Sequence, residues 1–146
     1  MKKSYEKVLT KNDTGETGGH QAGIVVPKKN AELLEFFPTL NVDEFNPDTW
    51  ILCEDPDGEH WKFRYVYYNG KTFSPAKSTR NEYRITHMTK FFVKWGANSG
   101  DSVMFSYSEQ FNHYKIQIKH RDEELKDTNS VREPQPVVLK GWRTVY

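Results

Sequence analysis

The feature that most constrains the fold is a set of short segments in which apolar and polar side chains alternate. The clearest is "HWKFRYVYY" (60–68), whose large aromatic residues stand at every second position: Trp61, Phe63, Tyr65 and Tyr67. "SGDSVMFSYS" (99–108) and "YKIQIKH" (114–120) repeat the pattern and are joined by a polar turn. A period of two places one face of a strand on the core and the other in solvent. The sequence therefore predicts a fold made mainly of half-buried strands, two of them in a hairpin.

Helices are predicted in only two places. Residues 28–40 carry apolar side chains at helical spacing, with Asn30 as a possible N-terminal cap and Pro38 as a stop, and residues 87–96 do the same with Gly96 past the end. Further strands are predicted in five segments: 4–10, 23–27, 50–54, around Tyr83 and Ile85, and a last one within 137–146. Such an order favours a barrel or open sheet with two small helices, and it is not the alternation of a parallel βαβ sheet.

The length of 146 residues suits one domain. We expect a single domain over 1–146, with a core from about residue 4 to 120 and a charged segment, 121–146, that supplies a final strand or a linker. The single cysteine, Cys53, cannot form an internal disulfide and has no ligand partner at zinc-site spacing. No apolar run approaches the roughly 18 residues of a membrane span. We therefore expect a cytoplasmic protein with no membrane partner.

The net charge of +1 hides a strong asymmetry along the chain. From Glu32 to Glu59 there are nine acidic residues and no Lys or Arg, whereas from His60 to Trp95 there are eight basic residues and one acid, Glu82. A polarised surface suits a polyanionic partner, because phosphates drive association with basic patches. An ordinary solvated charge run has the same composition, so charge alone leaves both interpretations open.

A polar, glycine-rich loop precedes the predicted strand 23–27. Its sequence, "KNDTGETGGHQAG" (11–23), lacks the Lys and Ser or Thr of a P-loop and does not match the dinucleotide fingerprint GxGxxG. Its short polar side chains suit contacts with phosphates or base edges. The candidate contact residues of this loop are Lys11, Asn12, Asp13, Thr14, Thr17, His20 and Gln21.

A second polar loop, "KSTRNEYR" (77–84), places Arg80, Glu82 and Arg84 at spacing two, so these side chains share one direction in an extended segment. Arg pairs with guanine O6 and N7, and Glu accepts from cytosine N4, which suits the reading of G·C pairs. The alternative is a ladder of ion pairs on an exposed edge strand, which contributes little energy. The candidate contact residues are Lys77, Ser78, Thr79, Arg80, Asn81, Glu82, Tyr83 and Arg84.

The sequence gives little support for catalysis. Nuclease chemistry needs clustered carboxylates and a Lys around metal ions, and the candidates Asp57, Glu124 and Lys126 are far apart in the chain. The five histidines are scattered and have no local nucleophile or acid partner. We therefore predict no catalytic residue, no metal ligand and no cofactor. A compact metal-dependent endonuclease and a protein-interaction barrel remain as alternatives.

Several motifs together resemble a known family. "NDTGETGGHQAG" followed by "VP", a helix ending in "FFP", and later "YYN" and "TRNEYRIT" are similar to the N-terminal effector domains of EcoRII-like restriction endonucleases. "WKFRY", "IT", "FFVKWG" and "SGDSVMF", between Trp61 and Phe105, also resemble the plant B-three DNA-binding pseudobarrels. The two resemblances agree because the EcoRII effector domain has the pseudobarrel fold. They cover the chain from about Lys7 to Ile118.

The resemblance implies a mainly β fold, a seven-stranded open pseudobarrel with two short helices. It also implies sequence-specific binding of double-stranded DNA at a CC(A/T)GG-like site through two arms in the major groove. We call residues 11–21 the N-arm, which includes His20, and residues 77–84 the C-arm, in which Arg80, Glu82 and Arg84 match base- and phosphate-contacting positions. The sequence departs from the family at Tyr83, where Lys is usual, and at Val25, where a DNA-contacting Tyr is usual.

The same resemblance implies a role within a larger enzyme. The chain would be the effector or targeting domain of a type II, specifically type IIE, restriction endonuclease of a bacterial restriction-modification defence. Its expected partners are double-stranded DNA and the C-terminal catalytic domain of the same enzyme, which alone would need magnesium. We expect the domain itself to be a monomer without chemistry of its own.

Overall fold

A computed structural model describes residues 4–16, 22–109, 113–121 and 141–145. The predictions for Thr17, His20 and Gln21, and for Glu124 and Lys126, therefore lie outside the described residues. In chain order the elements are β1 (Ser4–Val8), α1 (Lys11–Thr14), β2 (Ile24–Val26), α2 (Ala31–Phe36), β3 (Asp48–Glu54), β4 (His60–Tyr68), α3 (Gly70–Phe73), β5 (Glu82–Thr86), α4 (Thr89–Trp95), β6 (Ser102–Ser108), β7 (His113–Lys119) and β8 (Trp142–Val145). No helix of the described part is long and apolar enough to cross a membrane.

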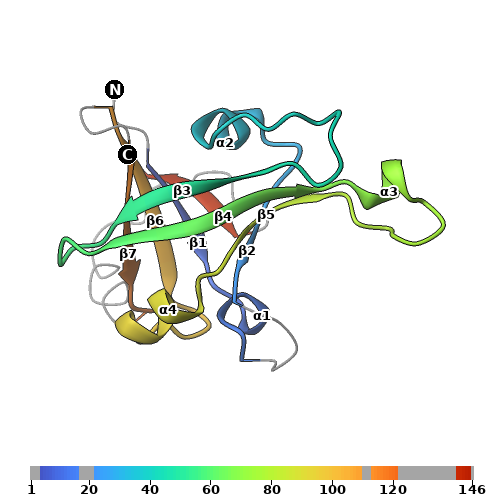
Figure 1. The fold of residues 1–146 in the computed structure, drawn as a ribbon. Helices are drawn as coiled ribbons and strands as arrows, with labels where there is room; N and C mark the ends of the chain where they lie inside the picture. The colour runs from blue at the N-terminus through green and yellow to red at the C-terminus, as the bar shows by residue number, and fades with distance from the viewer. Residues whose placement is uncertain (1–3, 17–21, 110–112, 122–140, 146) are drawn as a thin grey trace.

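All eight described strands belong to one sheet, in the order β2-β5-β4-β3-β7-β6-β1-β8. Neighbours pair antiparallel except β3 and β7, which are parallel. The sheet curls, so that β3, β4 and β5 cross over β6, β7 and β1 (Figure 1). This confirms the predicted open, mainly β pseudobarrel. Within the described residues it has eight strands where seven were predicted, and four short helices where two were predicted, since α1 and α3 are four residues each.

The alternating pattern predicts most of the inward positions, but not Val66, which it places on the outer face and which the structure buries completely. In β4, Phe63, Tyr65 and Tyr67 are buried while Lys62 is exposed. The predicted helices are also confirmed: the side chain of Asn30 accepts a hydrogen bond from the N–H of Leu33 at the start of α2. At the end of α4, Gly96 has the left-handed φ of 61° that favours glycine.

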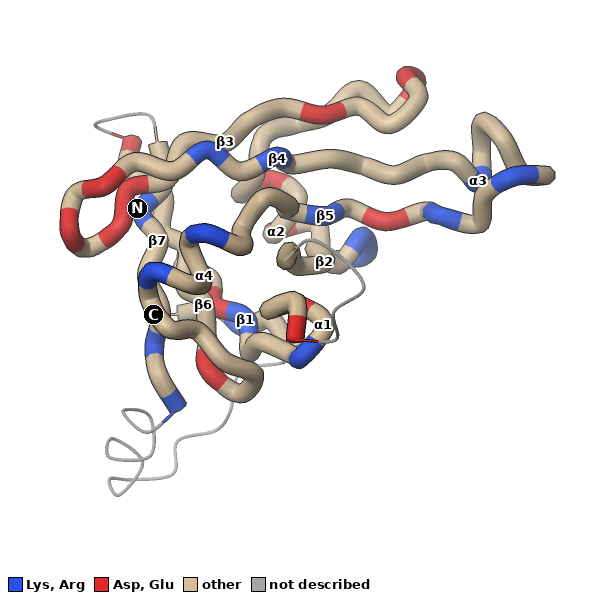
Figure 2. The backbone as a smooth tube through the Cα atoms, turned by 60° about the horizontal axis from the view of Figure 1, so that its bottom comes forward, with Lys and Arg blue, Asp and Glu red and all other residues tan. Residues whose placement is uncertain are grey.

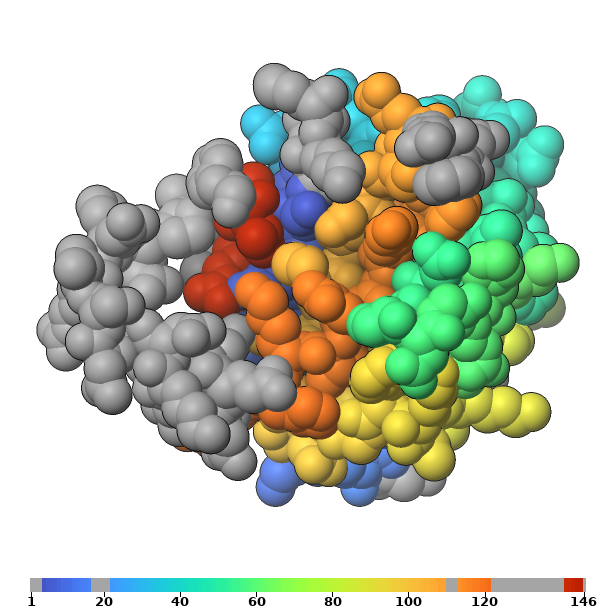
Figure 3. Space-filling model, turned by 90° about the vertical axis from the view of Figure 1, so that its left-hand side faces the viewer, coloured from blue at the N-terminus to red at the C-terminus, as the bar shows by residue number. Residues whose placement is uncertain are grey.

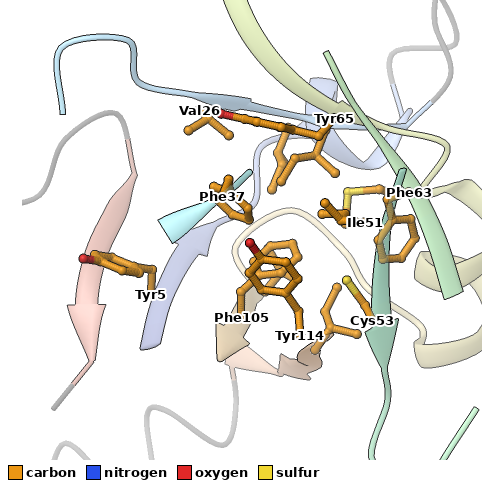
Figure 4. Packing of buried hydrophobic residues seen from close by; sticks show 14 of the residues in the cluster. Tyr5, Val26, Phe37, Ile51, Cys53, Phe63, Tyr65, Phe105 and Tyr114 are labelled. Atoms are coloured by element: carbon orange, nitrogen blue, oxygen red, sulfur yellow. The ribbon is translucent and has the colours of Figure 1, made fainter. Parts of the chain in front are cut away.

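Aromatic rings fill the interior of the curled sheet. Phe37, the residue after α2, lies among rings from both halves of the sheet, with centroid separations of 5.3 Å to Tyr65, 5.5 Å to Phe105 and 5.6 Å to Tyr114 (Figure 4). Contacts of this kind are favourable beyond the area that they bury. The sulfur of Cys53 lies in the same core, where burial raises the pKa of the thiol far above its ordinary value. The helix end at Phe37 therefore closes the core.

The turn between β3 and β4 lies against α4 (Figure 3), and one buried carboxylate joins the two. The side chain of Asp55 is fully buried and accepts hydrogen bonds from Lys94 Nζ at 2.7 Å and from the indole N–H groups of Trp61 and Trp95 at 3.1 Å each. Lys94 also lies 3.0 Å from Glu59. Lys94, from the basic stretch, is therefore neutralised by acids of the acidic stretch at this turn, so the charge asymmetry along the chain is only partly an asymmetry of the surface.

Candidate nucleic-acid interface

The two predicted arms lead into neighbouring strands. The N-arm precedes β2 and the C-arm runs into β5, and these strands pair antiparallel with Ile24 opposite Ile85 and Val25 opposite Arg84. Because the pairing is antiparallel, the arms join opposite ends of the same two-stranded ribbon (Figure 1). β5 begins at Glu82, so Arg80 lies beyond the paired part of the ribbon, on the side away from the N-arm. The scaffold therefore sets the spacing of the arms.

The N-arm begins with a capped turn of helix, α1. The hydroxyl of Thr10 accepts from the N–H of Asp13, and the carboxylate of Asp13 accepts from the N–H of Thr10 at 3.0 Å. The same carboxylate lies 2.5 Å from Lys7 Nζ, and both side chains are buried. Asp13 was predicted to contact DNA, but in the structure it is an internal cap and ion-pair partner. Sequence reasoning missed this pair because Lys and Asp are rarely buried.

The two residues that follow the N-arm, Ala22 and Gly23, are fastened to the scaffold as well. The N–H of Gly23 donates to the carbonyl of Asp13 at 3.0 Å, which joins the two ends of the arm. The N–H of Ala22 donates to the hydroxyl of Thr89 at the start of α4. Between these anchors, Lys11 and Asn12 are exposed and Thr14 is half-buried. The structure therefore presents Lys11 and Asn12 at the surface, as the sequence predicts.

Hydrogen bonds of a buried polar side chain support the backbone from which the C-arm extends. The buried amide of Asn69 donates to the carbonyl of Glu44 at 2.6 Å and accepts from the N–H of Asn46 at 2.8 Å. The N–H of Lys71, in α3, donates to the carbonyl of Arg80 at 2.9 Å, so α3 braces the returning chain. This bracing fixes the backbone of the C-arm before any ligand is bound.

The three charged side chains of the C-arm lie together, as their spacing predicts. The guanidinium of Arg80 lies 3.6 Å from the ring centroid of Tyr68 and 3.5 Å from the carboxylate of Glu82. Arg84 lies 3.5 Å from the same carboxylate oxygen. These contacts form the ladder of ion pairs that was the alternative to base reading, but β5 lies between β2 and β4 and is not an edge strand. Pairs of this length between partly exposed side chains contribute little energy, so the groups can exchange partners for a ligand at small cost.

Of the neighbours of these charges, Tyr83 differs from the prediction, and Asn81 is held by two hydrogen bonds. Tyr83 is buried and stacks on Tyr67 with ring centroids 4.3 Å apart, so its ring belongs to the interior and not to the surface. Burial, and then the neighbouring Tyr67, raise the pKa of Tyr83. Asn81 is oriented by Tyr67, whose hydroxyl donates to the amide oxygen at 2.5 Å. Lys28 Nζ donates to the same oxygen at 3.0 Å.

Lys28 is a candidate contact residue that sequence reasoning missed. It follows β2 and is 53 residues from Asn81 in the chain, and the pairing of β2 with β5 brings it to the C-arm. Lys71 and Lys77 flank the same region, and neither has a carboxylate within 4.0 Å among the residues that the structure describes. Basic residues therefore gather toward the α3 end of β5, whereas an acidic cluster marks the β3–β4 turn (Figure 2).

The geometry adds nothing to the nuclease alternative. Asp57 lies in the β3–β4 turn, 3.2 Å from Lys94. Within the described ranges there is no group of three or more His, Cys, Asp or Glu that could hold a metal ion. The other two residues of that hypothesis, Glu124 and Lys126, lie outside those ranges.

Comparison with known proteins agrees with the fold. The family described as "Restriction endonuclease EcoRII, N-terminal" matches residues 2–122. The type II restriction enzyme EcoRII of Escherichia coli is 42% identical over 88 residues, which are 56% of this chain and 20% of that enzyme. The B3 domain-containing transcription factor NGA4 of Arabidopsis thaliana is 31% identical over 101 residues, 69% of this chain and 25% of that protein.

A solved structure, the Arabidopsis FUS3-DNA complex, superposes with a TM-score of 0.58 at 24% identity, covering 78% of this chain and 93% of that chain. This likeness concerns the fold. The chain spans 20% of the length of EcoRII and 25% of the length of NGA4. Because the EcoRII match extends over most of the sequence, the chain belongs to the family of the N-terminal domain of restriction endonuclease EcoRII and has a B3-like pseudobarrel fold.

Proposed function

We propose that this chain binds double-stranded DNA in a sequence-specific manner, as the effector or targeting domain of an EcoRII-like type II restriction endonuclease. The observation that carries the proposal is the pair of polar arms at the two ends of the β2–β5 ribbon, with Arg80, Glu82 and Arg84 gathered on the C-arm. Two relatives give further support, since EcoRII is a restriction enzyme and the structure of similar fold is a complex with DNA.

The chemistry of the C-arm suits a CC(A/T)GG-like site. Arg can pair bidentately with guanine, and Glu can accept from the amino group of cytosine, so Arg80, Glu82 and Arg84 are matched to G·C pairs in the major groove. Lys77 carries charge for the adjacent phosphates, and we add Lys28 and Lys71 to it; these contacts hold the protein in register without reading sequence. A major groove about 12 Å wide admits a two-stranded β-ribbon, which is the element that carries the two arms.

The N-arm would contact the same groove from the other end of the ribbon. Lys11, Asn12 and Thr14 remain its proposed contacts among the described residues, together with Thr17, His20 and Gln21 from the sequence. Of the C-arm we retain Ser78, Thr79 and Asn81 beside the charged residues. Asp13 and Tyr83 leave the proposed set because both side chains are buried.

We further propose that the domain has no chemistry of its own. The chain spans one fifth of EcoRII, 20% of its length, so the cleavage reaction and its need for magnesium would belong to a C-terminal catalytic domain of the same enzyme. That domain and DNA would be the partners of a monomeric effector domain. Cleavage of plasmid DNA by this chain with magnesium present would overturn this part of the proposal.

Duplex binding tests the proposed function. We predict that Arg80→Ala and Glu82→Ala each weaken binding to a CC(A/T)GG duplex by about 1–3 kcal/mol per lost base contact, with a much smaller effect on a scrambled duplex. Titration of labelled duplexes at fixed salt measures both affinities. Glu82→Gln keeps the shape of the side chain and serves as a control for simple loss of packing. Equal affinity of the unmodified chain for the two duplexes would contradict sequence-specific binding, and no salt-dependent binding at all would favour the protein-interaction barrel.

A further inference from the structure

The last described strand, β8, connects the two edges of the open sheet. Among the described strands, β2 and β8 are the outermost, and β8 pairs only with β1, with Trp142 opposite Lys7. The indole N–H of Trp142 nevertheless donates to the carbonyl of Val25, in β2, at 2.7 Å. A single side chain therefore links the first and last strands of the sheet, 117 residues apart in the chain.

The indole of Trp142 is held firmly enough to act as an anchor. The side chain is buried, with 1% of its surface exposed. Its ring stacks on Phe105, with centroids 6.1 Å apart and an interplanar angle of 24°, and meets the edge of Phe37 at the same centroid separation of 6.1 Å. Its donor is thus aimed at β2 by the aromatic core and not by a flexible surface contact.

The strand that accepts this bond, β2, follows the N-arm in the chain. β2 has only three residues, and β5 is the one strand beside it in the described sheet. So short an edge strand has little pairing of its own. Val25, whose carbonyl accepts this bond, pairs with Arg84 of the C-arm. A shift of Val25 therefore changes the position of the N-arm relative to the C-arm.

The beginning of the N-arm depends on the same pair of strands. Lys7, opposite Trp142, forms the buried ion pair with Asp13 of α1. The N–H of Val8 donates to the carbonyl of Gly141 at 2.9 Å, immediately before β8. Gly141 has a φ of 87°, and an added Cβ would lie 3.3 Å from the carbonyl oxygen of Val8. The β1–β8 pair thus supports the N-arm at its entry and, through Trp142, at its exit.

We infer that Trp142 is a positioning residue for the DNA interface, an inference that rests on the proposed function: its indole N–H fixes β2, and with it the placement of the N-arm relative to the C-arm. Trp142 touches no ligand itself. It lies beyond residues 2–122, the part of the chain that the EcoRII family matches, so the assignment comes from the contacts of this chain alone.

The test compares two tryptophans that each donate one indole hydrogen bond. Trp142→Phe removes the bond to β2, and Trp95→Phe removes the bond to Asp55 at 3.1 Å, on the side of the molecule where the β3–β4 turn meets α4. Amide hydrogen exchange of Ile24 and Val26, without DNA, reports the opening of β2. Affinities for CC(A/T)GG and scrambled duplexes, measured well below the unfolding temperature of each variant, report the interface.

We expect Trp142→Phe to speed exchange in β2 and to weaken binding of the CC(A/T)GG duplex by about threefold to tenfold, the range of one buried hydrogen bond. Trp95→Phe should change neither, although it also lowers stability. Should the smaller ring prevent folding, 3-benzothienylalanine at position 142 keeps the bicyclic shape and lacks only the N–H. Unchanged exchange in β2, or an equal loss of affinity in Trp95→Phe, would overturn the inference.

The two proposals fail in different ways. If the unmodified chain does not distinguish the duplexes, the proposed function fails, and the exchange of Ile24 and Val26 still decides whether Trp142 holds β2. If the unmodified chain is specific and the Trp142 variants bind as well as it does, only the positioning role fails.

Discussion

Asp55 illustrates how one buried carboxylate organises a turn. Burial alone would raise its pKa, but the hydrogen bonds from Lys94, Trp61, the N–H of Glu59 and Trp95 outweigh burial and hold the pKa far below its ordinary value. Since the folded pKa lies below the unfolded value of about 3.9, the carboxylate contributes its full stabilisation above about pH 4. That contribution decreases as the pH falls further toward the folded pKa.

We therefore predict that Asp55→Asn lowers the free energy of unfolding at pH 7 by about 1–3 kcal/mol, because the buried donors lose a charged acceptor. The difference from the unmodified protein should shrink as the pH is lowered from 4 to 2. Urea denaturation across this range measures it. Asp57→Asn, at an exposed carboxylate 3.2 Å from the same Lys94, is the matched control and should have little effect. A difference that does not depend on pH would contradict the assignment.

At the scale of elements, the sequence predicts the strands and helices whose apolar residues recur at a regular spacing, and it misses the elements that are too short to show one. The alternation in 60–68 and the helical spacing in 87–96 identify β4 and α4 because each is long enough for its pattern to repeat. The helices α1 and α3 have four residues each, so no periodicity marks them, and the N-arm was accordingly expected to be a loop. Lys28 at the C-arm and Trp142 against β2 depend on strand pairing between distant segments, which a local pattern cannot reveal.

Two glycines test how closely these elements approach one another. An added Cβ at Gly23 would lie 2.5 Å from the carbonyl oxygen of Ile85, and one at Gly70 would lie 2.5 Å from the hydroxyl of Ser78. The first obstacle is backbone and the second is a side chain. We predict that Gly23→Ala separates β2 from β5 and lowers the free energy of unfolding by about 2 kcal/mol or more.

Gly70→Ala should also destabilise the protein, and the second substitution Ser78→Gly should restore most of the loss because it removes both atoms in the way. Thermal denaturation of the single and double variants provides the comparison. A Gly23→Ala variant as stable as the unmodified chain would show that β2 can move away from β5 freely, and the fixed spacing of the arms would then be wrong.

For the whole molecule, the basic side chains that can attract phosphates are those that no acidic side chain neutralises. Lys94 is neutralised by the β3–β4 turn, and Arg64 lies 2.6 Å from Asp48, whereas Lys77 stands on the C-arm without such a partner in the described part of the chain. The charge asymmetry of the sequence is thus a correct indication of a basic region but overstates its extent, because ion pairs between distant segments cannot be counted from the sequence.

We predict that Lys77→Ala weakens binding to the CC(A/T)GG and scrambled duplexes equally and reduces the slope of log affinity against log salt by about 0.9, the value for one phosphate contact. Lys115→Ala, which removes the same charge from an exposed position of β7, should leave the slope unchanged. Titrations at several salt concentrations give both slopes. Identical slopes for the two variants would mean that the C-arm does not lie against phosphates.

The buried thiol gives this protein an internal chemical reporter. Cys53 is the single cysteine of the sequence, its side chain has no exposed surface, and its raised pKa keeps it in the unreactive protonated form. Alkylating reagents can therefore reach it only when the aromatic core opens. The rate at which the thiol is alkylated reports how often the core opens. Variants of either arm can therefore be compared for global opening without attaching a label to the protein.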